Sequence, residues 1–527
     1  MTLTESEATA VAPYFTNIDR PVFALVNLPE TVKGALFARY SRSPKPLRRL
    51  FLDEFFEGTA PGADAGGGVR SERADKLYQR VFNEYGDDSV AQLGGVHLAV
   101  EDASNILTKV LERGRLMAYL EQSTRYIPYT ERRGTAWRYL VPAELDGHPL
   151  RERYIETMNA SFEIYAKWIP VMQQWFIDRH PKAATDSDAV YRAAIRAKAL
   201  DTLRGMLPAA TQSNVGMYGT GQAYEALLLR MRAHPLLEAR QTADLMLEEL
   251  RKVIPAFLTR VDQPERGGRW SSYLAETRGR MAELAERLSP APPQSGGDEV
   301  ALVDFDPDGE LKVVAAALYA SSSMSDRESM EVARRLTPSE RAEALRAYAG
   351  ERTNRRHKPG RAFERTSYRF DILTDYGAFR DLQRHRLLTI EWQALGPSHG
   401  YVRPEALVEA GALSDWEQVM DRSAELHQAL AGAGLTDVSQ YAVAMAYRVR
   451  FVMDMNAREA MHVIELRTAP QGHPAYRRVC QRMHSLIAET AGHHAIAAAM
   501  QFTDHSHVEL ERLQEERRSE QRRQAAQ

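Results

Sequence analysis

The sequence predicts a mixed α/β (α+β) fold that is rich in helices and holds a modest central sheet in each of two consecutive parts. Apolar residues recur at three-to-four spacing over long segments, which is typical of amphipathic helices. Strand-like runs are shorter and fewer, and they lie between the helical segments. Residues 288–299 are crowded with proline, glycine and serine, which neither a helix nor a central strand tolerates, so this segment divides the chain.

Each element follows from a local pattern. The apolar spacing predicts helices over 150–178, 187–206, 235–258, 270–288, 415–431 and 474–500. Short apolar runs predict strands over 96–100, 138–142, 300–305 and 368–373. Glycine-rich residues 58–68 predict a surface loop. The charged segment from Val508 onward predicts a solvated or frayed helix, because it lacks an apolar stripe.

The composition limits the class of protein. The chain has 527 residues, which allows two or more domains, and its 44% hydrophobic residues suit a soluble globular protein. A net charge of −3 gives no general attraction for nucleic acid or an anionic membrane. The single cysteine, Cys480, excludes an intrachain disulfide and suits a reducing cytoplasm. Because we find neither a long apolar run nor a signal-peptide pattern, we expect a cytoplasmic protein without membrane or nucleic-acid partners.

Two pairs of segments indicate an internal repeat. Residues 100–126 can be aligned with 370–396, so that Arg113-Gly114-Arg115 corresponds to Arg384-His385-Arg386. Residues 219–240 can be aligned with 456–477, so that Leu229-Arg230 corresponds to Leu466-Arg467. The matched segments occur in the same order in both parts of the chain, which favours a diverged tandem duplication over coincidence.

A first candidate site lies in the stretch EQSTRY. Glu121, Ser123 and Arg125 alternate with other residues, so on an extended segment their side chains share one face. An arginine fork, a hydroxyl and a carboxylate together suit a phosphorylated polar ligand. The same residues also fit a solvent-facing edge strand with an ordinary ion pair.

Two further arginines lie in apolar surroundings. Arg204 belongs to a helix-like segment that Pro208 ends, and Arg230 follows an apolar run. An arginine that emerges from a buried run needs a ligand or a carboxylate partner. Arg204 also fits an ordinary surface position.

Residues 456–467 read as a helix with its own local explanation. Asn456 can serve as the N-cap and Glu459 can complete a capping box. His462 and Glu465 lie three residues apart, but no further ligand follows at a predictable spacing, so we expect no metal. Cys480 is expected to pack inside a helix rather than to act as a nucleophile.

Taken together, these residues resemble the signature of the flavin-dependent thymidylate synthases. That signature reads Arg-His-Arg, then Ser and Asn, then Glu-x-Ser-x-Arg-Tyr, followed by an Arg four residues before a Pro and by Asn-x-Arg-Glu…His…Leu-Arg. The resemblance covers roughly residues 75–260 and 350–500. Because the pattern is long, it is far more specific than a single triplet.

The signature is divided between the two repeats. The first repeat has Arg113-Gly114-Arg115 in place of Arg-His-Arg but keeps Glu121, Ser123, Arg125, Tyr126, Arg204 and Arg230. The second repeat keeps Arg384-His385-Arg386 and matches the downstream part with Asn456, Arg458, His462 and Arg467. It has Glu391, Trp392, Ala394 and Gly396 where Asn, Glu, Ser and Arg are expected.

The resemblance implies a division of labour. The substrate-binding residues would hold the uridine nucleotide: Glu121, Ser123, Arg125, Arg204 and Arg230. The cofactor-binding residues would lie against FAD: Arg384, His385, Arg386, Asn456, Arg458 and His462. No residue is expected to act as a covalent nucleophile, since enzymes of this family do not require one.

The resemblance also implies domain limits and assembly. We expect a first repeat over 1–290, a second over 300–507 and a charged tail over 508–527. Because the family builds each active site from several subunits of a homotetramer, we expect a homodimer that forms a pseudo-tetramer with fewer than four sites.

The function that the resemblance implies is the reductive methylation of dUMP to dTMP, using FAD, NADPH and methylenetetrahydrofolate. Two alternatives stay open: a flavoenzyme that acts on another pyrimidine substrate, and a catalytically silent relative that binds flavin or nucleotide.

Overall fold

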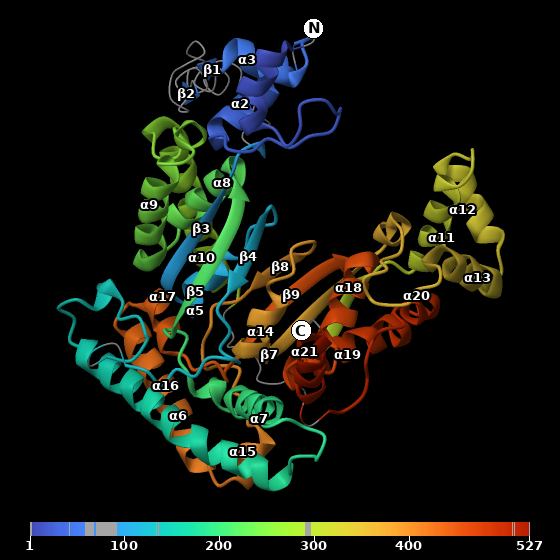
Figure 1. The fold of residues 1–527 in the computed structure, drawn as a ribbon. Coiled ribbons are helices and arrows are strands. Elements are labelled where there is room, and N and C mark those ends of the chain that lie inside the picture. The colour runs from blue at the N-terminus through green and yellow to red at the C-terminus, as the bar shows by residue number, and fades with distance from the viewer. Residues whose placement is uncertain are drawn as a thin grey trace. The chain divides into compact units, whose positions relative to one another are not determined.

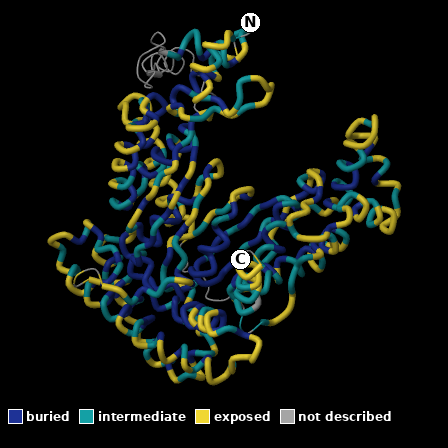
Figure 2. Tube along the Cα trace, viewed as in Figure 1, coloured by how far each residue is buried: buried dark blue, intermediate teal, exposed yellow. Residues whose placement is uncertain are grey.

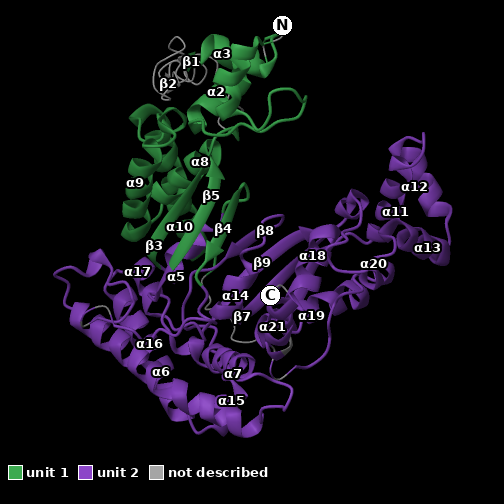
Figure 3. Ribbon diagram, in the orientation of Figure 1, with its two compact units in different colours: residues 1–103, 114–122, 214–292 green, residues 104–113, 123–213, 293–527 purple. Residues whose placement is uncertain are grey.

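The chain divides into two compact units, each described by itself (Figure 3). Unit 1 consists of Met1–Ala103, Gly114–Gln122 and Asn214–Pro292, and unit 2 consists of Ser104–Arg113, Ser123–Ser213 and Pro293–Gln527. The computed structural model describes residues 3–41, 43–57, 68–69, 92–132, 134, 136–289, 297–508, 510 and 512–525. The predicted repeat limits concern sequence and not packing, so they stay a prediction.

Unit 1 combines a three-stranded sheet, in the order β3-β5-β4, with helices and a small two-stranded sheet (Figure 1). Its strands are β1 (Phe56–Glu57), β2 (Gly68–Val69), β3 (Gly95–Ser104), β4 (Met117–Glu121) and most of β5 (Gln212–Thr220). Its helices are α1 (Glu5–Val11), α2 (Glu30–Tyr40), α3 (Leu47–Glu54), α8 (Gly221–Arg232), α9 (Leu237–Arg251) and α10 (Arg269–Leu288).

Unit 2 holds a four-stranded sheet in the order β6-β7-β9-β8. Its strands are β6 (Val300–Phe305), β7 (Ser367–Asp375), β8 (Thr389–Trp392) and β9 (Arg448–Asn456). Its helices are α5 (Asn105–Leu111), α6 (Arg151–Arg179), α7 (Asp188–Leu203), α11 (Gly309–Ala320), α12 (Asp326–Arg335), α13 (Pro338–Ala349), α14 (Tyr376–Leu382), α15 (Glu405–Glu409), α16 (Leu413–Gly432), α17 (Thr436–Ser439), α18 (Ala457–Arg467), α19 (Pro474–Glu489), α20 (His494–Ala499) and α21 (Leu513–Ala525).

The core of unit 2 follows the central strands. Along β9 buried and half-buried residues alternate, because successive side chains point to opposite faces of a strand. Strand β7, which pairs antiparallel with β9 along its whole length, ends in four buried residues. Figure 2 shows the buried positions gathered along these strands and the helices next to them.

The two sheets repeat one topology down to the pairing of single residues. Ala118 pairs with Tyr218 in the first sheet, and Thr389 pairs with Asp454 in the second. Thr389 follows Ala118 by 271 residues, the shift that carries Arg113 onto Arg384, and Asp454 follows Tyr218 by 236 residues. The same 271-residue shift carries α5 onto α14. This equivalence supports the internal duplication.

Within unit 2, the two repeats meet through a symmetric pairing of extended segments. The backbone N–H of Ala209 donates to the carbonyl of Val443 (2.8 Å), and that of Met445 donates to Leu207 (2.9 Å). The 236-residue shift carries 209 onto 445 and 207 onto 443, so each bond is the image of the other. Such reciprocity is the mark of a two-fold, isologous interface.

The sequence predicted the long helices better than the strands. All six expected helical segments hold a helix, although 474–500 contains two, α19 and α20. The expected strands over 96–100, 300–305 and 368–373 are present, but residues 138–142 form only the isolated bridge Tyr139–Thr211. Most of the loop expected at 58–68, and residues 290–296 of the expected linker, lie outside the described residues.

The charged tail differs from the solvated helix that we expected. Helix α21 forms, and Arg517 donates two hydrogen bonds to the buried carboxylate of Asp186 just before α7 (2.5 and 2.9 Å). The guanidinium of Arg512 lies 4.2 Å from the ring centre of Tyr126. The tail is therefore docked, and its lack of an apolar stripe is offset by these contacts. Among the described residues, the structure contains no helix that is both long and apolar enough to span a membrane.

Candidate functional site

The Arg-His-Arg triplet lies in the loop between α14 and β8 of unit 2. Helix α14 begins at Asp375, whose side chain accepts a hydrogen bond from the N–H of Ala378. The loop leaves Arg384 half-buried, His385 buried and Arg386 exposed. The triplet therefore presents one neutral ring between two cationic side chains, since burial lowers the pKa of His385 well below its usual value.

Asp381, which the sequence did not single out, is the carboxylate on which this loop depends. It lies in the last turn of α14 and forms an ion pair with Arg384. Its oxygens also lie 3.7 Å from Arg204 Nη1 and 3.8 Å from Arg467 Nη1. Burial opposes its ionisation, but these three guanidinium groups hold its pKa well below the usual range. Asp381 therefore brings together signature arginines of both repeats.

Arg125 is engaged by a second buried carboxylate. Its guanidinium donates to Asp201 of α7 through Nε (2.8 Å) and Nη2 (2.6 Å), and its Nη1 donates to the Tyr476 hydroxyl (3.3 Å). Burial would raise the pKa of Asp201, but Arg125 holds it below its usual value. The segment is a turn and not the extended stretch that we expected, because Arg125 donates its N–H to Ser123 Oγ (3.2 Å). Ser123 and Arg125 therefore do not project from one strand face.

The buried centre of unit 2 carries more positive than negative charge. Four guanidinium groups face two carboxylates: Arg125, Arg204, Arg384 and Arg467 face Asp201 and Asp381. His473 lies among them but is neutral, because burial lowers its pKa well below its usual value. Arg204 is 4% exposed, and its Nη2 has no hydrogen-bond partner among the described residues. An excess of buried positive charge favours an anionic ligand.

A cavity of about 840 Å³ adjoins this arginine cluster in unit 2. Asp201, Arg204 and His473 form one part of its lining, and Trp175 and Trp416 contribute aromatic faces. Small-molecule sites commonly occupy cavities of roughly 300–1,000 Å³ that combine apolar walls with a few polar groups. The cavity is therefore large enough for a nucleotide.

Asn456 and Arg458 are held by contacts within the protein. The Asn456 side chain accepts from the N–H of Glu459 (2.9 Å), which confirms the expected N-cap of α18. Arg458 donates to the carbonyl of Pro359 (2.9 Å) and lies 3.3 Å from Glu364. The expected capping box is wrong, because the Glu459 side chain faces His385 instead of the N-cap backbone.

Replacing Asn456 with alanine is expected to lower the free energy of unfolding by about 1 kcal/mol, since the first turn of α18 loses its cap. Asn456→Asp keeps a capping oxygen and is expected to retain most of this stability. Urea unfolding followed by tryptophan fluorescence measures both. A loss of bound flavin in both variants, with stability kept in the aspartate variant, would instead assign Asn456 a ligand contact.

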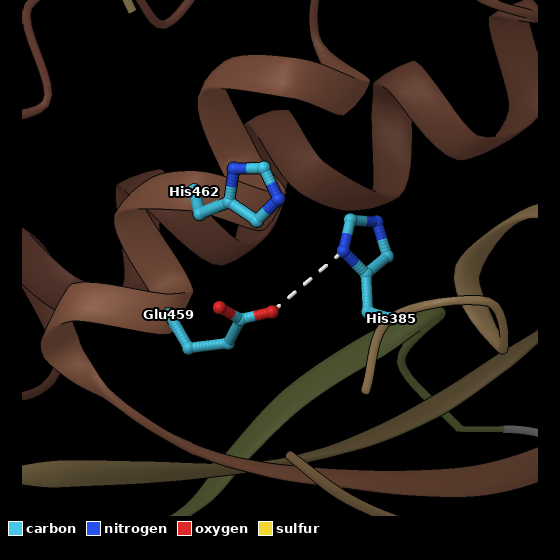
Figure 4. A group of neighbouring side chains, drawn as sticks. All are labelled: His385, Glu459 and His462. Atoms are coloured by element: carbon cyan, nitrogen blue, oxygen red, sulfur yellow. Dashed lines mark ion pairs between the residues drawn. The ribbon is translucent and has the colours of Figure 1, made fainter. Parts of the chain in front are cut away.

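Arg467, His385, Glu459 and His462 form a chain of contacts (Figure 4). Arg467 Nε donates to His385 Nε2 (2.9 Å), and His385 Nδ1 lies 3.7 Å from Glu459 Oε1. The rings of His385 and His462 meet edge to face, with centres 5.6 Å apart. Burial raises the pKa of Glu459 to about 7 and lowers that of His462 to about 4.

The remaining predicted residues, Glu121 and Arg230, belong to unit 1 and are both engaged in contacts there. Arg230 corresponds to Arg467, and Gly114 corresponds to His385. A Cβ built on Gly114 would lie 3.7 Å from Arg230 Nη2 and 2.6 Å from the hydroxyl of Tyr119. The first repeat thus keeps an arginine beside this loop, while a tyrosine hydroxyl occupies the space next to the glycine.

The sequence identified the arginines of unit 2 but missed their partners. Asp201, Asp381, Glu459 and His473 carried no motif, and three of them pair with residues far along the chain. One signal was available: a buried arginine requires a carboxylate, and Asp201 and Asp381 each stand in a strongly apolar helical stretch. The contact of Glu459 was hidden by its fit to a capping box.

The fold and this cluster define a class: an internally repeated α+β protein that gathers arginines of both repeats around buried carboxylates. The family model described as "Thymidylate synthase complementing protein" matches residues 41–256 and 301–493. The chain therefore belongs to that family, the flavin-dependent thymidylate synthase family.

Relatives of two kinds are similar to this chain. A "UPF0159 protein" of Chlamydia muridarum (strain MoPn / Nigg) is 35% identical over 517 residues, which cover 96% of each chain. A "Flavin-dependent thymidylate synthase" of Clostridium tetani (strain Massachusetts / E88) is 26% identical over 187 residues, 35% of this chain and 70% of the relative. A solved structure, a UMP/dUMP methylase PolB from Streptomyces cacaoi bound with 5-Br dUMP, gives a TM-score of 0.30 at 19% identity, over 38% of this chain and 94% of that one.

Proposed function

We propose that this protein is a flavin-dependent enzyme that methylates dUMP reductively to dTMP, with FAD as cofactor and with NADPH and methylenetetrahydrofolate as co-substrates. The observation that carries the proposal is the meeting of signature residues in unit 2. Arg204 of the first repeat and Arg384 and Arg467 of the second surround the same carboxylate, Asp381. The two incomplete signatures thereby complement each other.

The residues of the loop fit an anionic cofactor. Arginine is always protonated in proteins and offers only donors, so Arg384 and Arg386 present positive charge on both sides of a neutral His385. Bound FAD would take hydride from NADPH and supply the reducing equivalents for the methyl group. The chain's own part is to hold the ring system, exclude water and stabilise negative charge in a buried setting. Asn456 and Arg458 would support this loop from α18.

The arginine cluster fits the phosphate of a pyrimidine nucleotide. Two positive charges in excess match a phosphate dianion, and the unpartnered Nη2 of Arg204 supplies a donor. Arginine holds phosphate with two parallel hydrogen bonds, which gives alignment as well as affinity. Glu121, Ser123 and Arg230 stay proposed contacts of the same substrate. We further propose that two chains assemble as a homodimer, which would hold four repeats.

The purified protein is expected to carry bound flavin, visible as its absorption in the blue. Replacing Arg384, His385 and Arg386 together with alanine is expected to abolish that absorption, because the anion then loses its fixed cations. The equivalent change of Arg113 and Arg115 in the first repeat is a matched control and is expected to leave flavin in place.

Product analysis tests the substrate. With NADPH and methylenetetrahydrofolate supplied, dUMP should be converted to dTMP. Flavin binding without dTMP would favour the alternative of another pyrimidine substrate, which a parallel assay with UMP addresses. A protein that holds no flavin under reconstitution would overturn the proposal and leave a silent nucleotide-binding relative.

A further inference from the structure

The hydrogen bond from Arg467 fixes where the proton of His385 sits. Arg467 Nε can only donate, so His385 Nε2 accepts with its lone pair at 2.9 Å. Burial lowers the pKa of His385 well below its usual value, and the nearby Arg467, His462 and Arg384 lower it further. The ring therefore carries a single N–H, and that N–H is at Nδ1.

Glu459 is the group that faces this N–H. Its Oε1 lies 3.7 Å from His385 Nδ1, and Figure 4 shows the carboxylate turned toward the ring. The backbone of Glu459 is fixed, because its N–H is bonded to the Asn456 cap of α18. Both side chains are 5% exposed, so water does not compete strongly for the contact. A shift of less than about 1 Å would complete a hydrogen bond to an ionised acceptor.

The same three side chains, His385, Glu459 and His462, lie close enough for a metal ion, with their ligand atoms within 4.8 Å of one another. Two features argue against that use. A metal on Nδ1 would move the ring proton to Nε2, where it would face the N–H of Arg467. Lys358 and Arg355 also act on this group and disfavour a further cation.

We propose that Glu459 is the positioning residue of His385: its carboxylate accepts the Nδ1 proton and so fixes the ring in the loop of the triplet. The contact itself is a property of the apo protein, while its effect on the cofactor rests on the proposed function. When Glu459 is protonated it becomes a weaker acceptor, and the ring is held by Arg467 alone. The orientation of His385 thus becomes dependent on pH.

The charges around the pair set the range of this dependence. Burial raises the pKa of Glu459 to about 7, against the opposing effect of Lys358, Arg458 and Arg386. Around His385, Arg467, His462 and Arg384 lower its pKa and Asp381 raises it. Around His462, burial acts first and Lys358, Arg355 and Arg467 follow. Of these three side chains, Glu459 is the one that changes its charge near neutrality.

The test is nitrogen-15 spectroscopy of the apo protein with labelled histidine, in which His385→Gln assigns the signal. We expect the Nδ1–H form of His385, with chemical shifts that titrate around pH 7. In Glu459→Gln this titration should disappear, while in the exposed Glu489→Gln it should persist. An Nε2–H form, or an unchanged titration in Glu459→Gln, would overturn the proposal. Because no flavin is present, failure here is distinct from failure of the proposed function.

A stability measurement follows the same contact and detects a misfolded variant. The pKa of Glu459 is raised on folding, so its favourable contribution is present at low pH and is lost as pH rises through about 7. Glu459→Gln stays neutral, so its urea midpoint should gain on wild type between pH 5 and pH 8. Parallel pH curves for the two proteins would contradict a buried, titrating Glu459.

Discussion

Replacing Asp381 with asparagine is expected to lower the free energy of unfolding by about 3–5 kcal/mol, since three guanidinium groups lose their shared carboxylate in a buried setting. Arg204, Arg384 and Arg467 all face Asp381, which is 7% exposed. Asparagine has nearly the same shape, so the loss reports charge and not a cavity. Urea unfolding of the full chain, followed by tryptophan fluorescence, measures it.

The same variant gives a direct view of anion binding. With Asp381 neutral, the cluster gains one more uncompensated positive charge, so inorganic phosphate or dUMP should raise the urea midpoint of the variant more than that of wild type. Asp421→Asn, an exposed aspartate of α16, is the control and should change stability by no more than about 0.5 kcal/mol. If Asp381→Asn matches this control, the carboxylate does not organise the arginines.

Arg125→Met is expected to cost a similar amount, about 3–5 kcal/mol, because it leaves Asp201 buried without its partner. Arg125 holds both oxygens of Asp201, and this carboxylate is buried inside α7. Adding Asp201→Asn should restore most of the loss, because the second change removes the unpaired charge. The loss should also shrink at low pH, since burial without Arg125 raises the pKa of Asp201 and lets it take a proton.

An exposed ion pair supplies the control for this cycle. Arg132 and Glu163 lie 3.3 Å apart and are 47% and 59% exposed. Breaking it by Arg132→Met should cost about 0–1 kcal/mol, as solvent screens both charges. Equal losses in the two cycles would show that Arg125 contributes packing rather than charge.

Local pattern was enough to predict the long helices, and it failed for the strands that pair across the sheets. Helix α6 was expected almost to the residue despite Pro170 inside it, because its apolar spacing is regular over eight turns' length of sequence. Strands β5 and β9 were missed because their residues alternate too weakly with glycine and charge. Their identity depends on partners about a hundred residues away, which no local window contains.

The candidate site divides in the same way. Motif resemblance was enough to predict Arg204 and Arg384, but the choice of Asp381 as their common partner is a matter of tertiary packing. The docked tail illustrates the point from the other side: Arg517 looked solvated in sequence, and only the fold brings the buried Asp186 beneath it. Spacing along the chain carries information about one helix face, and not about which faces meet.

The reciprocal pairing of 205–210 with 441–446 has a consequence for how this protein could diverge. In an assembly of identical subunits, every substitution is imposed on all copies at once, so a position cannot serve one site and abandon another. Fusion of two copies into one gene removes that constraint while the backbone keeps its symmetry. Under the shifts that relate the repeats, Val110 corresponds to Asp381 and Gln440 to Arg204. One chain could therefore keep a single full set of charges and let the other set erode without loss of the scaffold.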